Sequence, residues 1–101
     1  MGRNRRPQPL YLSKKLLEIR MRLKLTQVEM ADSLNSKKSP VHPGNISEYE
    51  LGKREPSLLT LLKYAKLAGI SMDILVDDEF NLPEKLPSRP KHKLIAKKKR
   101  I

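Results

Sequence analysis

The sequence contains no cysteine and no tryptophan, and its 101 residues include only one phenylalanine and three tyrosines. The lack of cysteine excludes disulfide bonds, thiolate zinc sites and a cysteine nucleophile. A hydrophobic core must therefore be built mostly from leucine, isoleucine, valine and methionine. The shortage of aromatic side chains also argues against a basic RNA-binding factor, because such proteins commonly stack bases on aromatic side chains.

Long apolar segments are missing as well. No apolar run approaches the roughly 18 residues needed to cross a bilayer, and the arginine-rich start lacks the apolar segment of a secretory signal. We therefore expect a cytoplasmic protein without membrane contact. The two histidines, His42 and His92, are too few for a metal site. No nucleophile or base is organised around the acidic residues of segment 73–79, so the sequence predicts no cofactor and no enzymatic activity.

Basic residues are abundant, with 22 lysines and arginines against 11 aspartates and glutamates. Three of the basic residues lie in residues 1–9 and eight in residues 84–101, whereas residues 10–83 hold eleven basic and ten acidic residues. Such ends cannot bury enough apolar surface to fold alone. We therefore predict a basic N-terminal arm at residues 1–9, a nearly neutral folded domain at residues 10–82 and a basic, flexible C-terminal tail at residues 83–101. The ends are either solvated or bound to a polyanion.

The spacing of apolar residues predicts a first helix that begins near Tyr11, with Leu12, Leu16, Ile19 and Leu23 on one side. A second helix begins with a capping box of Thr26 and Glu29 and ends near Asn35. We expect it to bury Val28, Ala31 and Leu34, with Met30 beside them.

A third helix is predicted from about His42–Pro43 to Leu51, because proline is well tolerated in a first turn and Gly52 stops the helix. Pro56 and Ser57 precede a fourth helix that ends at Gly69, with an apolar face formed by Leu58, Leu61, Leu62, Ala65 and Ala68. Ser71 begins a short fifth helix, MDILVDD. No segment has the pattern of a strand, so the predicted fold class is all-α with five helices.

The second and third predicted helices form a pair joined by a turn, and such a pair can place a polar helix in the major groove of DNA. The order LxxIRxxLxLTQxExAxxL, followed by NISxYExGKxxPSLxTLLKxAKxxGIS, resembles the Xre/Cro family of phage-repressor-like helix-turn-helix proteins over about residues 12–75. The resemblance implies a five-helix domain of the phage-repressor type, whose helix near residues 43–51 enters the groove. Relative to the family, the chain has about five extra residues, Ser36–Pro40, in the turn.

The resemblance places two of the family's base-reading positions on Pro43 and Gly44, which have no side-chain donor. We therefore predict that base readout depends on Asn45, Ser47 and Glu48, with His42 contributing from the loop. Asparagine can pair with adenine, and a carboxylate can accept a hydrogen bond from cytosine; alternatively, Glu48 has a structural partner.

Contacts to the DNA backbone are predicted at the start of the second helix, in the extra turn residues and after the third helix. These residues are Thr26, Gln27, Lys37, Lys38, Lys53 and Arg54. The extra turn residues could equally be a solvated loop that faces away from DNA. Arg3, Arg5 and Arg6 in the N-terminal arm are suited to a minor groove.

Two further positions follow from the resemblance. Arg20 and Glu50 match a buried structural ion pair of relatives, and Lys24 replaces the glycine that is usual at the end of the first helix.

We interpret the sequence as a sequence-specific regulator of transcription that binds double-stranded DNA. A repressor is favoured, because 101 residues leave no room for a ligand or catalytic domain. One recognition helix reads only a few base pairs, so we expect a homodimer. Apolar residues Phe80, Leu82 and Leu86 would contact the second copy or another protein. The alternative is an antitoxin or adaptor that acts mainly through a protein partner.

Overall fold

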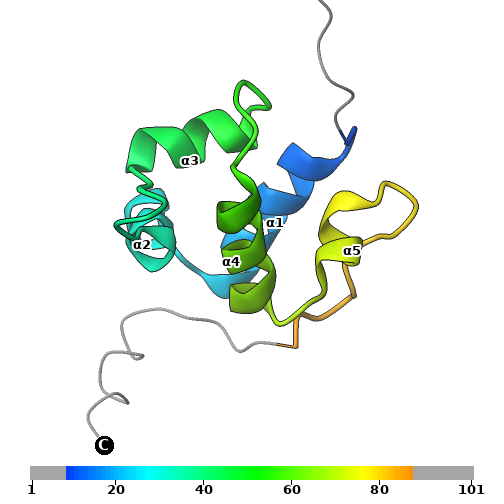
Figure 1. Cartoon of the computed structure of the whole chain (residues 1–101). Helices are drawn as coiled ribbons and strands as arrows, with labels where there is room; N and C mark the ends of the chain where they lie inside the picture. The colour runs from blue at the N-terminus through cyan, green and yellow to red at the C-terminus, as the bar shows by residue number, and fades with distance from the viewer. Residues whose placement is uncertain (1–8, 88–101) are drawn as a thin grey trace, which may run out of the picture.

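The computed structural model describes residues 9–87, and Arg3, Arg5, Arg6 and the tail from residue 88 onward lie outside the described residues. The described part contains five helices and no strand: α1 (Leu12–Leu23), α2 (Gln27–Leu34), α3 (Pro43–Glu50), α4 (Leu58–Ala68) and α5 (Met72–Val76) (Figure 1). This confirms the predicted all-α fold. With twelve residues α1 is the longest, and no described helix is long and apolar enough to cross a membrane.

Local capping fixes where the helices begin. The hydroxyl of Thr26 accepts a hydrogen bond from the Glu29 amide at 3.1 Å, and the Glu29 carboxylate accepts one from the Thr26 amide at 2.9 Å. This confirms the predicted capping box of α2. Ser57 precedes α4, and its hydroxyl accepts a hydrogen bond from the amide of Thr60 at 3.2 Å.

Three helices end in the same way, on a residue with left-handed backbone angles. Gly52 after α3 has a φ of 75° and Gly69 after α4 has a φ of 79°. After α1 the same position is held by Lys24, with a φ of 61°. The Lys24 amide donates to the Met21 carbonyl at 3.1 Å and the Leu25 amide to the Arg20 carbonyl at 3.2 Å, which is the Schellman pattern that glycine normally supports. The lysine therefore adopts a backbone conformation that its Cβ atom disfavours.

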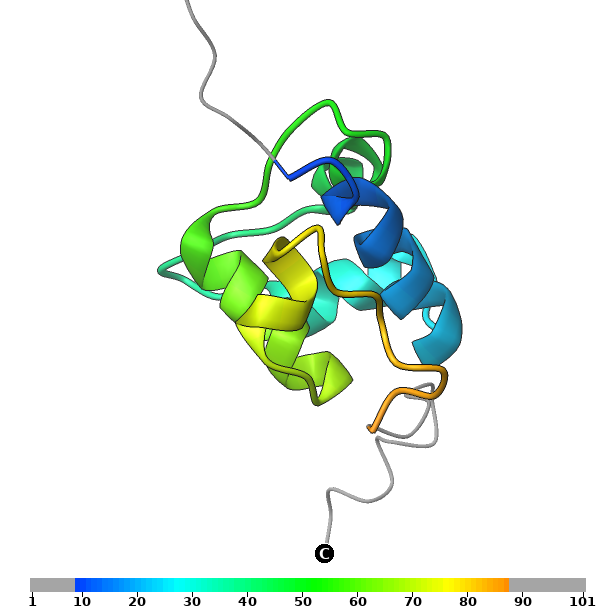
Figure 2. The same cartoon turned by 90° about the vertical axis from the view of Figure 1, so that its right-hand side faces the viewer.

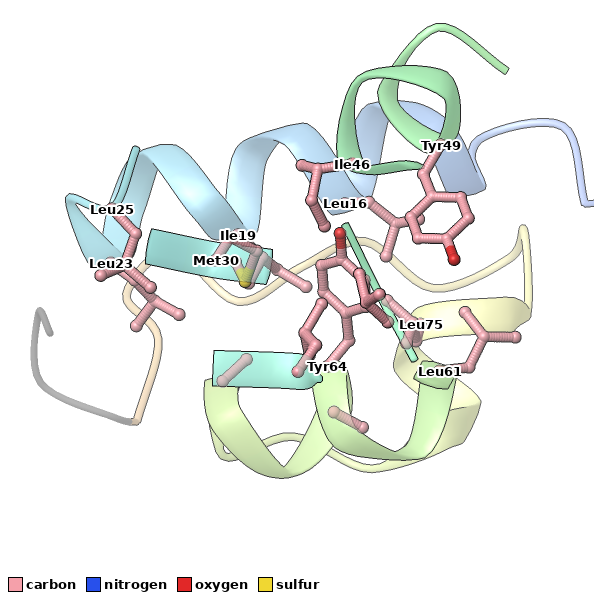
Figure 3. Packing of buried hydrophobic residues seen from close by; sticks show 14 of the residues in the cluster. Leu16, Ile19, Leu23, Leu25, Met30, Ile46, Tyr49, Leu61, Tyr64 and Leu75 are labelled. Carbon is pink, nitrogen blue, oxygen red and sulfur yellow. The ribbon is translucent and has the colours of Figure 1, made fainter. Parts of the chain in front are cut away.

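The core lies between the helices and is built mainly from leucine, isoleucine and alanine, with Met30 and the rings of Tyr49 and Tyr64 (Figure 3). All four apolar positions predicted for α1 are buried. On α2 the prediction for Val28 was wrong: Val28 is exposed and Met30 is buried in its place. Met30, Ala31 and Leu34 share one side of the helix, whereas Val28 precedes Met30 by two positions and faces away.

The buried side of α4 also differs from the prediction. Leu61, Ala65 and Ala68 are buried as expected, but Leu58 and Leu62 are exposed. Thr60 and Tyr64 are buried instead. The core side of α4 therefore differs in part from the predicted apolar face, and leucine side chains remain on the outer surface of the helix.

The start of α1 and the end of α5 are joined by hydrogen bonds between side chains of one segment and backbone groups of the other. Buried Lys15 donates from its Nζ atom to the carbonyls of Ile74 and Asp77, at 2.8 and 3.0 Å. In return, the Asp78 carboxylate accepts hydrogen bonds from the amides of Leu10 and Tyr11, at 2.9 and 3.1 Å. These two bonds lower the pKa of Asp78 below its ordinary value.

Beyond α5 the chain returns along α1. Arg22 donates to the carbonyls of Pro83 and Glu84, and Leu82 and Leu86 are partly buried against the core. Of the apolar surface predicted to meet a partner, Leu82 and Leu86 thus pack within the same chain, and Phe80 is left half-exposed.

The described chain enters and leaves at opposite ends of the domain. Pro9 and Leu10 line a cavity together with Tyr49, Gly52 and Arg54, so the described part of the chain begins beside the end of α3. In both views α3 and the start of the described residues (blue) lie at one end, and the last described segment (orange) lies at the other (Figures 1 and 2).

Candidate nucleic-acid interface

Helix α3 is anchored to the core by one side. Ile46 and Tyr49 are buried against the other helices (Figure 3), and burial raises the pKa of the Tyr49 phenol. Asn45, Ser47 and Glu48 lie between the buried positions and are partly exposed. The three residues predicted to read bases therefore keep some access to a ligand.

Arg20 and Glu50 form an ion pair that joins α1 to α3. The Nε atom of Arg20 lies 2.7 Å from one carboxylate oxygen of Glu50, and its Nη2 atom lies 3.1 Å from the other. The two side chains are only 14% and 5% exposed. The hydrogen bonds to Glu50 raise the pKa of the Arg20 guanidinium.

Gln27 brings α2 into the same network. Its amide nitrogen donates to the Glu50 carboxylate at 3.1 Å, and Arg20 also donates to the carbonyl of Leu25 at 3.0 Å. One carboxylate therefore fixes the positions of α1, α2 and α3 relative to each other.

The side chain of Asn45 helps to cap the start of α3 and is also partly exposed. Its side-chain oxygen accepts a hydrogen bond from the His42 amide at 2.9 Å, while His42 itself is exposed at the helix start. The acceptor of Asn45 is thus engaged within the protein. Its amide nitrogen is the atom of this side chain best suited to donate to a base.

Glu48 has a structural partner, which was one of the two alternatives that the sequence allowed for this residue. Its carboxylate lies 2.8 Å from the Nε atom of Arg54, and the two side chains are 41% and 59% exposed. The amides of Lys53 and Arg54 both donate to the Glu48 carbonyl, at 2.9 and 3.3 Å. Lys53 and Arg54 are therefore held at the end of α3, and Arg54 offsets the negative charge of Glu48.

The start of α2 is only partly free for a phosphate. The capping box engages the amides of Thr26 and Glu29 and places a carboxylate there, while the side chain of Gln27 turns toward Glu50. The amides of Gln27 and Val28 take no part in the capping box, and these are the groups that an anion could meet.

Residues 16–75 match the model of the helix-turn-helix family HTH_3. The chain belongs to this family. It is also 38% identical over 69 residues to YqaE of Bacillus subtilis, an uncharacterized HTH-type transcriptional regulator, covering 68% of this chain and 55% of the relative. It is 38% identical over 65 residues to the HTH-type transcriptional regulator ImmR of the same organism, covering 64% of this chain and 47% of ImmR. The chain spans about half the length of these two relatives.

The turn of this helix-turn-helix protein, which holds the residues predicted to be extra, forms a closed loop. The Asn35 side chain accepts a hydrogen bond from the Val41 amide at 2.8 Å, and the amides and carbonyls of Ser36 and Ser39 bond to each other. Inside the loop, the buried Ser39 hydroxyl lies 2.9 Å from that of Thr60. The loop is thereby fixed to the start of α4.

The two lysines of this loop, Lys37 and Lys38, are exposed. Lys38 lines an open groove together with Arg54, Ser57 and Leu58, so the loop adds a positive charge beside the start of α4. Sequence reasoning did not find Ser39, because nothing near it marks a serine whose partner is 21 residues away.

Tyr64 lies under the helix-turn-helix pair, and its role was also missed. In Figure 3 its ring points from α4 toward α3. Burial, and then the negative charge of Glu50, raise the pKa of its hydroxyl group. The hydroxyl is fully buried without a hydrogen-bond partner in the described part of the chain. Within residues 9–87 no group of His, Asp or Glu side chains is placed to hold a metal ion.

Proposed function

We propose that the protein is a sequence-specific regulator of transcription, acting as a repressor in the cytoplasm, that binds double-stranded DNA with α3 in the major groove. The observation that carries this is the match of residues 16–75 to the helix-turn-helix family, together with the partly exposed polar side of α3. The two relatives that are named as HTH-type transcriptional regulators support the same function.

Base readout is assigned to Asn45, Ser47 and Glu48, with His42 at the helix start. Asn45 would donate from its amide nitrogen, since its oxygen already caps the helix. A carboxylate that accepts a hydrogen bond favours cytosine. The bond to Arg54 supports this role for Glu48, because the arginine reduces repulsion between the carboxylate and nearby phosphates.

The DNA backbone contacts are assigned to residues that surround α3. They are Thr26, Gln27, Lys37, Lys38, Lys53 and Arg54. Four of these are lysine or arginine side chains that are exposed, and lysine and arginine are the usual partners of phosphate oxygens. Arg3, Arg5 and Arg6, which lie outside the described residues, would follow the minor groove. Their assignment is supported by the start of the described chain beside the end of α3.

Selection from a random duplex library, followed by titration of the selected duplex, tests this function. We expect binding at near-physiological salt at least about 1,000-fold tighter than binding to an unrelated duplex. Asn45→Ala and Glu48→Ala should each reduce the preference for single base pairs by about 1–3 kcal/mol. Lys53→Ala should weaken all duplexes about equally. Failure to select any duplex would contradict the proposal and favour a protein that acts through a protein partner.

A further inference from the structure

The segment that joins α2 to α3, residues 35–42, is called here the α2–α3 loop, and it is fixed to one side of α4. The loop buries the side chains of Ser39 and Val41, whereas Lys37 and Lys38 are exposed. Figure 2 shows the loop reaching past the first turns of α4. Connecting segments usually run over the surface, because a buried loop carries polar groups that need partners. A buried serine therefore marks a loop whose conformation is held by specific contacts.

Three polar residues along α4 hold this loop. The Ser39 hydroxyl lies 2.9 Å from that of Thr60 and 3.4 Å from that of Ser57, and the hydroxyl of Ser57 donates to that of Thr60 at 3.0 Å. One turn later, the Nζ atom of Lys63 donates to the Leu34 carbonyl at 3.0 Å. Residues three apart lie on one face of a helix, so positions 57, 60 and 63 form a polar stripe that faces the loop. These contacts are called here the loop anchor.

Hydrogen bonds within the loop fix the backbone on both sides of its two lysines. The amide of Ser39 donates to the hydroxyl of Ser36 at 3.1 Å, and the amide of Val41 donates to the side chain of Asn35 at 2.8 Å. Ser36 and Ser39 immediately flank the lysines, so the backbone of the lysines is closed into a short turn. Because Ser39 is also tied to α4, the position of that turn is set by α4.

The loop places its lysines near the basic residues that follow α3. Lys38 lines an open groove that Arg54 also lines, and the Arg54 amide donates to the Glu48 carbonyl at 3.3 Å. The loop and the end of α3 therefore present positive charge around the same groove. A side chain on an ordered backbone loses less conformational freedom on binding than one on a mobile loop, so a fixed loop favours affinity.

We propose that Ser39 and Thr60 are positioning residues for DNA binding, which hold the α2–α3 loop against α4 so that Lys37 and Lys38 are already placed to contact the phosphate backbone. The inference rests on the proposed function, because it concerns how the lysines assigned there to phosphates are held. Both hydroxyls are buried, so they act through the lysines and do not touch DNA. A loop that merely connected α2 to α3 would need no buried hydroxyl pair, because a buried polar group costs free energy unless it is hydrogen-bonded.

Amide hydrogen exchange of the full-length protein tests the loop anchor without DNA. Ser39→Ala removes the bond to Thr60, whose hydroxyl keeps its partner at the start of α4. We expect the Val41 amide to exchange at least about fivefold faster in this variant, because the loop opens more easily. Ser33→Ala is the matched control, since it removes an exposed hydroxyl that bonds to the Glu29 carbonyl within α2, and it should leave the exchange of Val41 unchanged. Equal exchange of Val41 in the unsubstituted protein and both variants would overturn the proposal.

A double-mutant cycle then connects the loop anchor to DNA. Ser39→Ala should weaken binding to a duplex about three- to tenfold, as expected for side chains that act together. In a protein that also carries Lys37→Ala and Lys38→Ala, the same substitution should change the affinity by less than about twofold, because the contacts that Ser39 positions are gone. Equal weakening in the two backgrounds would overturn the proposal, since the serine would then act on the fold as a whole and not through the lysines. No weakening in either background would overturn it as well.

Two substitutions of Thr60 separate the role of the hydroxyl from a general loss of structure. Thr60→Val keeps the shape of the side chain but removes the hydroxyl, so it should weaken DNA binding as Ser39→Ala does. Thr60→Ser keeps the hydroxyl and should bind within about twofold of the unsubstituted protein. Thermal melting gives a temperature at which all variants are folded, and binding is compared there. Equal weakening by both Thr60 substitutions would show that the methyl group matters and not the hydroxyl, which would overturn the proposal.

The loop anchor and the proposed function can fail separately. Contacts to phosphates do not depend on the base sequence, so the cycle is also run on an unrelated duplex at low salt. Coupling between Ser39 and the lysines on that duplex, with no duplex selected from the random library, would support the loop anchor and contradict the proposed function. A selected duplex whose binding shows no such coupling would support the function and overturn the loop anchor.

Discussion

At the scale of single residues, Glu50 has the most connections around the candidate interface. Its carboxylate accepts hydrogen bonds from two nitrogens of Arg20 and from the amide of Gln27. Glu48 lies two residues earlier, and among the side chains of residues 9–87 it bonds to Arg54 in a pair that is about half-exposed. The two glutamates therefore differ in what their removal should cost.

Glu50→Ala should destabilise the fold by about 3–5 kcal/mol, because it leaves the guanidinium of Arg20 largely buried without its counter-ion. A small domain has only about 5 kcal/mol or somewhat more in total, so the variant should be largely unfolded at 37 °C. Glu48→Ala is the matched control and should cost at most about 1 kcal/mol, as exposed ion pairs do. Thermal melting measures both, and equal melting temperatures would contradict the role given to Glu50.

A substitution of Lys24 should increase the stability of the fold rather than lower it. Glycine adopts the left-handed backbone of this position without the steric cost that a Cβ atom brings. Lys24→Gly should therefore stabilise the fold by about 1 kcal/mol and raise the melting temperature by about 4–8 °C. Lys24→Ala removes the same charge but keeps the Cβ atom, so it should bring no comparable gain. A gain of equal size in both variants would show that the lysine charge, and not the backbone, sets the cost.

At the scale of whole elements, Lys15 and Asp78 join α1 to α5 by bonds to backbone groups rather than to each other. The two aspartate bonds also fix Leu10 and Tyr11, which immediately precede α1. The direction in which the chain enters the domain is therefore set by a residue from the far end of the described sequence.

Asp78→Asn should lower the stability of the fold at neutral pH, and the difference from the unsubstituted protein should disappear in acid. A carboxylate whose pKa is lower in the folded state stabilises the fold above its unfolded pKa. That contribution is lost as the pH falls through the folded pKa, which for Asp78 lies below 3.8. Urea unfolding between pH 7 and pH 3 measures the difference. Asp77→Asn is the control, because among residues 9–87 the Asp77 side chain bonds to the nearby amide of Glu79. A constant difference at all pH values would contradict the assignment.

The same elements show what the sequence can and cannot predict. Helix starts and ends were predictable, because the capping box of Thr26 and the stops at Gly52 and Gly69 involve residues within a few positions of each other. The bond between Ser39 and Thr60 spans 21 positions, and the bond between Asp78 and Leu10 spans 68. Neither bond can be predicted from the residues next to it in the sequence. The exposed leucines of α4 were missed for a related reason, since an almost continuous apolar segment does not tell which side meets the core.

At the scale of the molecule, most of the net positive charge lies outside the described domain. Residues 9–87 carry 12 basic and 11 acidic residues, whereas residues 1–8 and 88–101 together carry ten basic residues and no acidic one. The described domain alone should therefore attract DNA weakly over long distances. Most of the charge that could neutralise phosphates belongs to the two ends.

Removing residues 1–8 and 88–101 together should reduce the dependence of DNA affinity on salt. Each phosphate that the protein neutralises contributes about −0.9 to the slope of log K against log salt. If half of the ten charges contact phosphates, the slope should become less steep by about 4–5 units. The slope is measured by titrating DNA with the protein at salt concentrations between about 50 and 300 mM, which bracket the physiological ionic strength.

The separate truncations distinguish the two ends. Loss of residues 1–8 should also change the preference for base pairs at the edges of the site, because the chain enters beside α3. Loss of residues 88–101 should leave the preferred sequence unchanged. A doubly truncated protein that kept the full-length slope would show that neither end contacts DNA.

The described chain enters and leaves the domain at opposite ends, which also matters for anyone who wishes to use the protein as a tool. A fluorescent protein or an affinity tag joined to the carboxyl-terminal side would follow the segment that leaves the described domain at the end opposite α3 (Figures 1 and 2). The same cargo joined to the amino-terminal side would precede the segment that enters the described domain beside the end of α3. Carboxyl-terminal fusions should therefore report on the native molecule in cells, and surface immobilisation for binding assays should use that end as well.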